Sequence, residues 1–227
     1  MRKSLYVMVL AVVALVATSC STTKTTKGMQ YSKLYDEKPV VLLIMPPINN
    51  TTNVEAKDLF FTSVSEPLAE AGYYVLPPLM AMDVLRNESA YDAELFIDAP
   101  LGQFKEYFGA DAVVFSVIDS WKKVVTGINT KITYIVKSTS TNEVLFERTC
   151  NLTLDYTGNN TSGGLLGALI DVAVAAIETA ATDHIKAARL ANEFIFKDIP
   201  VGKYHPRYMQ DMEDEAQPKV VSRTVKG

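Results

Sequence analysis

The sequence has few of the residues on which disulfide frameworks, metal sites and nucleic-acid binding depend. Its 227 residues include two cysteines and two histidines, which excludes a disulfide scaffold and leaves too few ligands for a zinc cage. The formal net charge is −4 at pH 7, so we expect no nucleic-acid partner. No metal or other cofactor is expected.

The remaining composition is that of a globular protein. The chain is 48% hydrophobic and 21% charged, a balance that argues against a mostly disordered chain and against a polytopic membrane protein. At this length a single domain with tails can bury a sizeable core.

The N-terminus carries the pattern of an export signal. Arg2 and Lys3 precede an apolar run over residues 5–17, which is short for a bilayer span but has the length of a signal-peptide core. The segment ATSC, residues 17–20, resembles a bacterial lipobox, so we expect cleavage before Cys20 and a diacylglycerol on its sulfur. The alternative is an ordinary signal peptide with a chance cysteine. Serine after Cys20 favours the outer membrane, and we expect the periplasmic face.

Composition divides the chain into four parts. Residues 1–19 are predicted to be a lipoprotein signal peptide. Residues 20–37 are predicted to be a flexible tether, because the stretch STTKTTKG is too polar to pack. Residues 38–199 form the predicted α/β domain. Residues 200–227 are polar and broken by proline, so we expect a largely extended or disordered tail.

Strand and helix signals alternate through the first half of the domain. The apolar run VVLLIM, residues 40–45, predicts a strand buried on both faces. Thr52 and Glu55 fit a capping box for a helix that Pro67 should kink or restart. This order predicts parallel strands covered by helices. The other elements expected here are strands at 73–76 and 112–118 and helices at 79–87 and 101–108.

The second half changes pattern. Alternating residues over 130–138 and 143–154 predict an antiparallel hairpin with one wet face. Residues 165–192 have the spacing of one long amphipathic helix. The predicted fold class is therefore α/β, a mixed β-sheet flanked by helices, with a long C-terminal helix and a polar tail.

Five ordered segments resemble one family. They are VVLLIMPPINNTT, EPLAEAGYYVLP, FGADAVVF, SGGLLGALI and YHPRY, which together span roughly residues 38–208. They resemble a family of uncharacterised Gram-negative lipoproteins that includes a meningococcal vaccine candidate. The resemblance implies an α/β fold like the N-terminal domain of TolB, which is also the fold of the curli secretion subunit CsgG and of LpoB, an activator of a peptidoglycan synthase.

The resemblance also suggests a function. It implies a non-enzymatic accessory of envelope export or assembly, partnered by a CsgG-like component. The alternative is an LpoB-like regulator whose partner is a peptidoglycan synthase. A hydrolase or small-ligand binder is a third hypothesis, but the sequence offers no constellation of catalytic residues for it.

A glycine- and alanine-rich stretch is the strongest candidate for a contact surface. Residues 164–177 carry one charge, Asp171, and small residues allow close helix approach. The stretch either packs on the sheet or forms an interface between copies of the chain. The candidate interface residues are Leu165, Leu166, Leu169, Ile170, Ala173 and Ile177.

Other residues with potential chemistry have simpler interpretations. Cys150 falls on the apolar face of its strand and is expected to be a buried hydrophobe. His184 is expected at the surface or boundary of its helix, and Trp121 with Lys122 and Lys123 either closes the core or meets a partner. The carboxylates of Asp36, Glu37 and residues 213–215 are interpreted as solubilising charge in flexible segments.

Cys20→Ala tests the lipidation directly. Without the thiol no thioether to diacylglycerol can form, so the variant should leave the membrane fraction and lose incorporation of a radioactive fatty acid. Continued fatty-acid labelling of the variant would contradict lipidation at Cys20.

Overall fold

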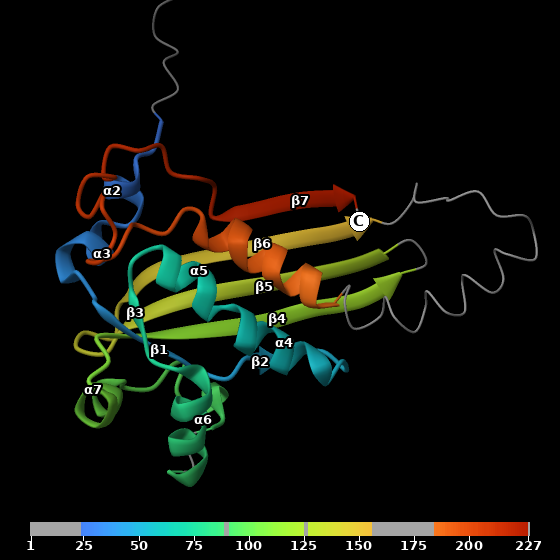
Figure 1. Ribbon diagram of the computed structural model, residues 1–227, viewed down its shortest axis with the longest axis horizontal. Helices are drawn as coiled ribbons and strands as arrows, with labels where there is room; N and C mark the ends of the chain where they lie inside the picture. Colours follow the sequence, from blue (N-terminus) through green and yellow to red (C-terminus); the bar gives the residue numbers. More distant parts are fainter. Residues whose placement is uncertain (1–23, 89–90, 125–126, 156–183, 227) are drawn as a thin grey trace, which may run out of the picture.

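The computed structural model describes residues 24–88, 91–124, 127–155 and 184–226 (Figure 1). Within these ranges no helix is both long and apolar enough to cross a membrane. The predicted signal peptide, Cys20 and the candidate interface at residues 164–177 lie outside the described residues.

One mixed sheet organises the described chain. Its strand order is β3-β1-β4-β5-β6-β7, with the short β2 also paired to β4. β1 pairs in parallel with β3 and β4, β4 to β6 form an antiparallel meander, and β7 returns parallel to β6. The predicted mixed sheet and hairpin are confirmed. The strands are β1 (Val41–Ile44), β2 (Ile48–Asn49), β3 (Tyr74–Val75), β4 (Ala112–Val124), β5 (Gly127–Ser138), β6 (Val144–Asp155) and β7 (Val220–Lys226).

β1 is buried on both faces, as its unbroken apolar run predicts. Leu42 and Ile44 join the core cluster on one side of the sheet, whereas Leu43 and Met45 join the cluster on the other. β2 continues the same path along β4, with Ile48 opposite Val117. The two prolines between β1 and β2 lack the N–H needed for the ladder, so they divide one strand path into two.

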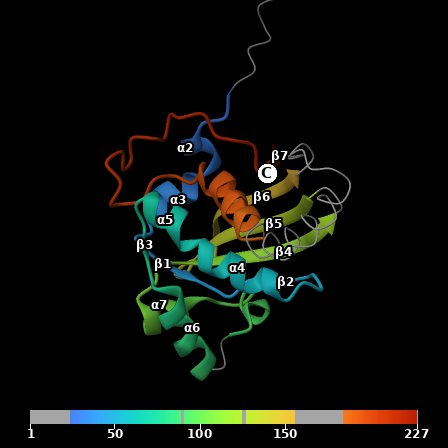
Figure 2. The same ribbon diagram turned by 45° about the vertical axis from the view of Figure 1, so that its right-hand side comes forward.

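Helices cover both sides of the sheet (Figures 1 and 2). The helix of residues 184–196 lies with α4 and α5 on one side, and α6, η1 and α7 lie on the other. Pro67 sits in the first turn of α5, where its missing N–H costs no helical hydrogen bond, so the predicted restart is confirmed. The helices are α4 (Glu55–Ser63), α5 (Ser65–Glu70), α6 (Pro78–Asn87), the 3₁₀ turn η1 (Ala93–Leu95) and α7 (Gly102–Phe108).

The turn before α4 differs from the predicted capping box. The Asn53 side-chain oxygen, not that of Thr52, accepts from the backbone N–H of Ala56 at 3.3 Å. Asn49 Oδ1 accepts from the backbone N–H and the hydroxyl of Thr51, which closes the preceding turn. The Asn53 side chain thus takes the role predicted for Thr52, and the Asn49 side chain closes the turn before it.

The prediction of a flexible tether over residues 20–37 is wrong for residues 24–37. These residues form α2 (Lys27–Gln30) and α3 (Ser32–Glu37). Tyr31, Leu34 and Tyr35 are each at most 4% exposed, and the Tyr31 ring lies 5.1 Å from that of Phe146. Residues at i, i+3 and i+4 lie on one side of a helix, so these three side chains form one apolar face. The polar residues around them make this pattern hard to see in the sequence.

The tail is also part of the fold, so the prediction of a largely extended or disordered segment at 200–227 is wrong. The backbone N–H groups of Gly202 and Tyr204 donate to the carbonyls of Ala71 and Gly72 at 2.8 and 2.9 Å. Gly72 has φ +87°, and a Cβ there would fall 2.6 Å from the Cβ of His205. Glycine at position 72 therefore both ends α5 and admits the tail.

A buried arginine joins the tail to the sheet. Arg148 on β6 is 1% exposed. Its Nη1 donates to the carbonyls of Phe194 and Ile195 at 3.0 and 2.6 Å, at the end of the helix of residues 184–196. Its Nε and Nη2 donate to the Pro218 carbonyl at 3.2 and 3.1 Å, just before β7 begins. One guanidinium therefore fixes β6, the last helix and the entry to β7.

Arg148→Ala should destabilise the fold by about 3–5 kcal/mol, because three backbone carbonyls lose a charged donor within a buried site. Urea unfolding of the Cys20→Ala protein at pH 7 measures this change. Arg223→Ala is the matched control, since Arg223 is exposed on β7, its Nη1 donates to the neighbouring Ser222 carbonyl, and its guanidinium lies 6.0 Å from the Phe194 ring. It should shift stability by about 1 kcal/mol or less. Equal effects of the two substitutions would contradict the bridging role of Arg148.

Candidate functional site

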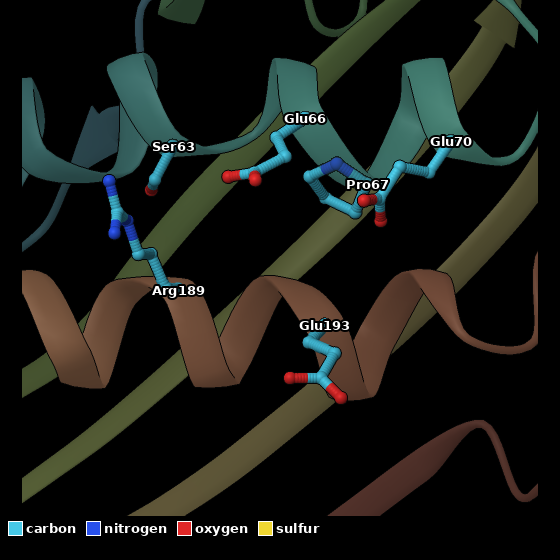
Figure 3. A pocket seen from close by; sticks show the side chains of 6 residues that line it. All are labelled: Ser63, Glu66, Pro67, Glu70, Arg189 and Glu193. Carbon is cyan, nitrogen blue, oxygen red and sulfur yellow. The ribbon is translucent and has the colours of Figure 1, made fainter.

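A groove runs between α4–α5 and the helix of residues 184–196 (Figure 3). We call it the helix groove; its volume is about 300 Å³. Figure 3 shows Glu66 and Glu70 on α5, with Arg189 and Glu193 on the facing helix. The groove is lined by Ser63, Glu66, Pro67, Glu70, Arg189 and Glu193.

Ser63, which lines the helix groove, is joined to a chain of buried polar side chains. Asn192 is fully buried and its Nδ2 donates to Ser63 Oγ at 2.8 Å. The Tyr134 hydroxyl donates to Asn192 Oδ1 at 2.6 Å. Burial raises the pKa of Tyr134 well above 10, so the phenol remains a donor at neutral pH. These bonds hold Ser63 and Asn192 in a structural chain.

The rim of the helix groove is acidic. Glu66, Glu70 and Glu193 are exposed, and Arg189 is the cation beside them. In the described ranges no group of three or more histidine, cysteine, aspartate or glutamate side chains could hold a metal ion. The carboxylates attract positive charge in solution, but solvent screens them.

A second groove is mostly apolar and lies between α6 and α7. We call it the α6–α7 groove; its volume is about 340 Å³. Apolar side chains that line it remain in solvent, with Val84 44% and Tyr107 77% exposed. Clustered exposed apolar side chains mark an interaction surface. The groove is lined by Val84, Leu85, Glu88, Phe96, Gln103, Phe104, Tyr107 and Phe108.

The structure brings Trp121 and His184 together. Trp121 is 5% and His184 7% exposed, and Trp121 Nε1 donates to His184 Nδ1 at 2.8 Å. The interpretation of Trp121 as a core-closing residue is confirmed, while the expected surface or boundary position of His184 is wrong. The buried indole N–H requires an acceptor, and His184 supplies it. Lys122 and Lys123 are exposed.

Cys150 is buried, as predicted from the alternation of its strand. It is fully shielded from solvent, and burial raises the pKa of its thiol to about 11. A thiol with this pKa is protonated at neutral pH and is a poor nucleophile.

The interpretation of the carboxylates as solubilising charge in flexible segments is wrong for Glu37, Asp214 and Glu215, which each have a partner in the structure. Glu37 Oε1 accepts from the Thr141 hydroxyl at 2.6 Å. Asp214 pairs with Arg207 at 2.9 Å, and this partner lowers the pKa of the Asp214 carboxyl. Glu215 pairs with a lysine near the N-terminus, Lys24, at 2.7 Å. Glu37 joins α3 to the turn between β5 and β6, and Glu215 joins the tail to the N-terminal segment, whereas the Asp214–Arg207 pair lies within the tail.

The family model described as "Putative lipoprotein GNA1162-like" matches residues 29–199. The chain belongs to this family. The resemblance inferred from the sequence is thereby confirmed. A curated relative, "Putative lipoprotein NMB1124/NMB1162" of Neisseria meningitidis serogroup B strain MC58, is 25% identical over 183 residues, 78% of this chain and 83% of the relative.

Two solved structures resemble the fold. The crystal structure of lipoprotein GNA1162 from Neisseria meningitidis has 23% identity and a TM-score of 0.47, over 63% of this chain and 99% of that chain. The dodecamer of a PelC variant from Paraburkholderia phytofirmans has 13% identity and a TM-score of 0.43, over 70% of this chain and 87% of that chain.

Proposed function

We propose that this GNA1162-family member is a lipid-anchored protein of the cell envelope that acts through protein contacts. Cys20 carries the acyl anchor at the periplasmic face of the outer membrane. The protein serves as a non-enzymatic accessory of an export or assembly complex with a CsgG-like component. We also propose that the fold is TolB-like, as the sequence resemblance implies. Family membership over residues 29–199 is the observation that carries it.

The placement of the reactive side chains supports a role without catalysis. His184 accepts from Trp121, and His205 Nδ1 accepts from the backbone N–H of Arg207 at 3.1 Å. Cys150 is buried with a raised pKa. These three side chains serve packing and local hydrogen bonds, whereas a nucleophilic mechanism needs a base within hydrogen-bond reach of an accessible nucleophile.

The α6–α7 groove is the surface that we assign to the partner. It lies at the opposite end of the molecule from α2 and the point where residue 24 enters the fold (Figures 1 and 2). A membrane attached through Cys20 therefore lies at the other end, and the groove faces the aqueous compartment. An apolar groove in that position suits a protein partner that buries Val84 and Tyr107 at its centre.

A regulator of a peptidoglycan synthase, in the manner of LpoB, is the second candidate. It uses the same anchor and the same groove but a different partner. The identity of the captured protein separates the two functions.

Val84→Asp with Tyr107→Asp should disrupt the complex. Charges placed at the groove exclude an apolar partner, so recovery after cross-linking should fall at least about tenfold. Cells are cross-linked, membranes are solubilised with the anchor intact, and companions of the purified protein are identified by mass spectrometry.

Val54→Asp is the matched control, since Val54 is 82% exposed and precedes α4 on the other side of the sheet. It should leave recovery unchanged. A CsgG-like component lost only from the double variant supports the export function, and a peptidoglycan synthase supports the second candidate. Recovery of the same partner by both variants would overturn the assignment of the groove.

A further inference from the structure

We infer that one end of the folded body rests directly against the lipid surface. This end, which we call the anchor pole, consists of α2 and the tail segment 203–217. The inference rests on the proposed lipidation of Cys20. It follows from where the chain joins the fold and from how few residues remain between that point and the lipid.

The N-terminal segment is fixed to the tail from residue 24 onward. Lys24 Nζ lies 2.7 Å from a carboxylate oxygen of Glu215. The Ala216 N–H donates to the Thr25 carbonyl at 2.9 Å, and the Lys27 N–H donates to the Asp214 carbonyl at 2.9 Å. The chain therefore becomes part of the body within a few residues of Cys20.

A buried ion pair makes this junction costly to open. Lys27 is 8% exposed and Asp211 is fully buried, with Nζ 3.4 Å from Oδ2. Lys27 Nζ also donates to the Ile199 carbonyl at 3.4 Å, and Asp211 Oδ2 accepts from the Val201 N–H at 3.0 Å. Peeling α2 away to lengthen the tether would leave a buried carboxylate without its cation, which is strongly unfavourable.

The chain between the lipid and the body is short. Three residues, 21–23, which we call the leash, separate Cys20 from Lys24. Even fully extended, four peptide steps reach about 14 Å. A domain of this size is roughly 40 Å across. A body about three times wider than its leash is held with its attachment point within about 14 Å of the lipid, so the anchor pole is the end nearest the headgroups.

The exposed side chains of the anchor pole suit a lipid headgroup region. Met29 is 67% and Tyr204 65% exposed, and Lys203 and Arg207 are exposed beside Tyr204 in the chain. Tyrosine places an apolar ring and a polar tip at such an interface. Lys203 can extend its apolar stem along the surface and keep its charge in water, whereas Arg207 is paired with Asp214.

The short leash also limits where a partner can be. The α6–α7 groove lies at the far end of the body (Figures 1 and 2). A partner bound there must lie within roughly 55 Å of the bilayer, one domain width plus the extended leash. The partner therefore contacts the protein close to the membrane, because the leash is too short to act as a long flexible arm.

Depth-dependent quenching on vesicles tests the orientation. The lipidated protein is reconstituted into phosphatidylethanolamine vesicles that contain a nitroxide-headgroup lipid. A fluorophore is attached at Met29→Cys or Tyr204→Cys on the anchor pole. In separate variants it is attached at Met80→Cys in α6 or Tyr107→Cys in α7, at the opposite end of the body, which we call the far pole. Cys150 is buried and stays unlabelled in the folded protein. We expect several-fold stronger quenching at the anchor pole than at the far pole.

A lengthened leash is the control. A Gly/Ser insertion of about 20 residues after Thr23 adds roughly 25 Å of mean reach, so it should bring the four positions close to equal quenching. Equal quenching at all four positions with the native leash, or stronger quenching at the far pole, would overturn the inference. Failure of the unlabelled native protein to float with vesicles would instead contradict the proposed lipidation, so the two failures are distinguishable.

Discussion

The hydrogen bonds of the Arg148 guanidinium are the interaction on which the arrangement of residues 184–226 depends. It is buried within β6 and binds three carbonyls, two at the end of the helix of residues 184–196 and one at the entry to β7. A buried charge is tolerated only where its donors are satisfied, so helix and tail must both be in place. Asp198 extends the same junction, because its Oδ1 accepts from the Gln217 N–H and its Oδ2 accepts from the Tyr31 hydroxyl. The two ends of the chain thereby meet at one side of the sheet.

Contacts of this kind join segments that are far apart in the chain. They separate the parts of the fold that the sequence predicts from the parts that it does not. Two elements are visible in the sequence. Burial on both faces leaves the continuous apolar run of β1 (Val41–Ile44), and burial on one face leaves the alternating pattern of the hairpin. The terminal segments are not visible in the same way. Their stability comes from contacts far apart in the chain, such as Lys27 with Asp211, and each segment alone has the composition of a polar tether.

The same reasoning applies to the candidate sites. Cys150 is predictable because a small apolar residue on a strand's inner face is ordinarily buried. Arg148 and His184 are not, because polar residues gain their burial from partners that only the fold supplies, backbone carbonyls in one case and the Trp121 indole in the other. The α6–α7 groove also escapes sequence analysis, since it forms between two helices separated by η1.

The central claim is that both terminal segments belong to the cooperative fold, which the proposed orientation at the membrane requires. Hydrogen–deuterium exchange of the backbone amides of Gly28, Gly202 and Met45 tests it most directly. The N–H groups of Gly28 and Gly202 join α2 and the tail to neighbouring segments, whereas the N–H of Met45 donates to the Val114 carbonyl within the sheet. The account predicts protection at Gly28 and Gly202 comparable to that of Met45. Exchange at Gly28 and Gly202 at the rate of an unfolded chain, with Met45 still protected, would contradict it.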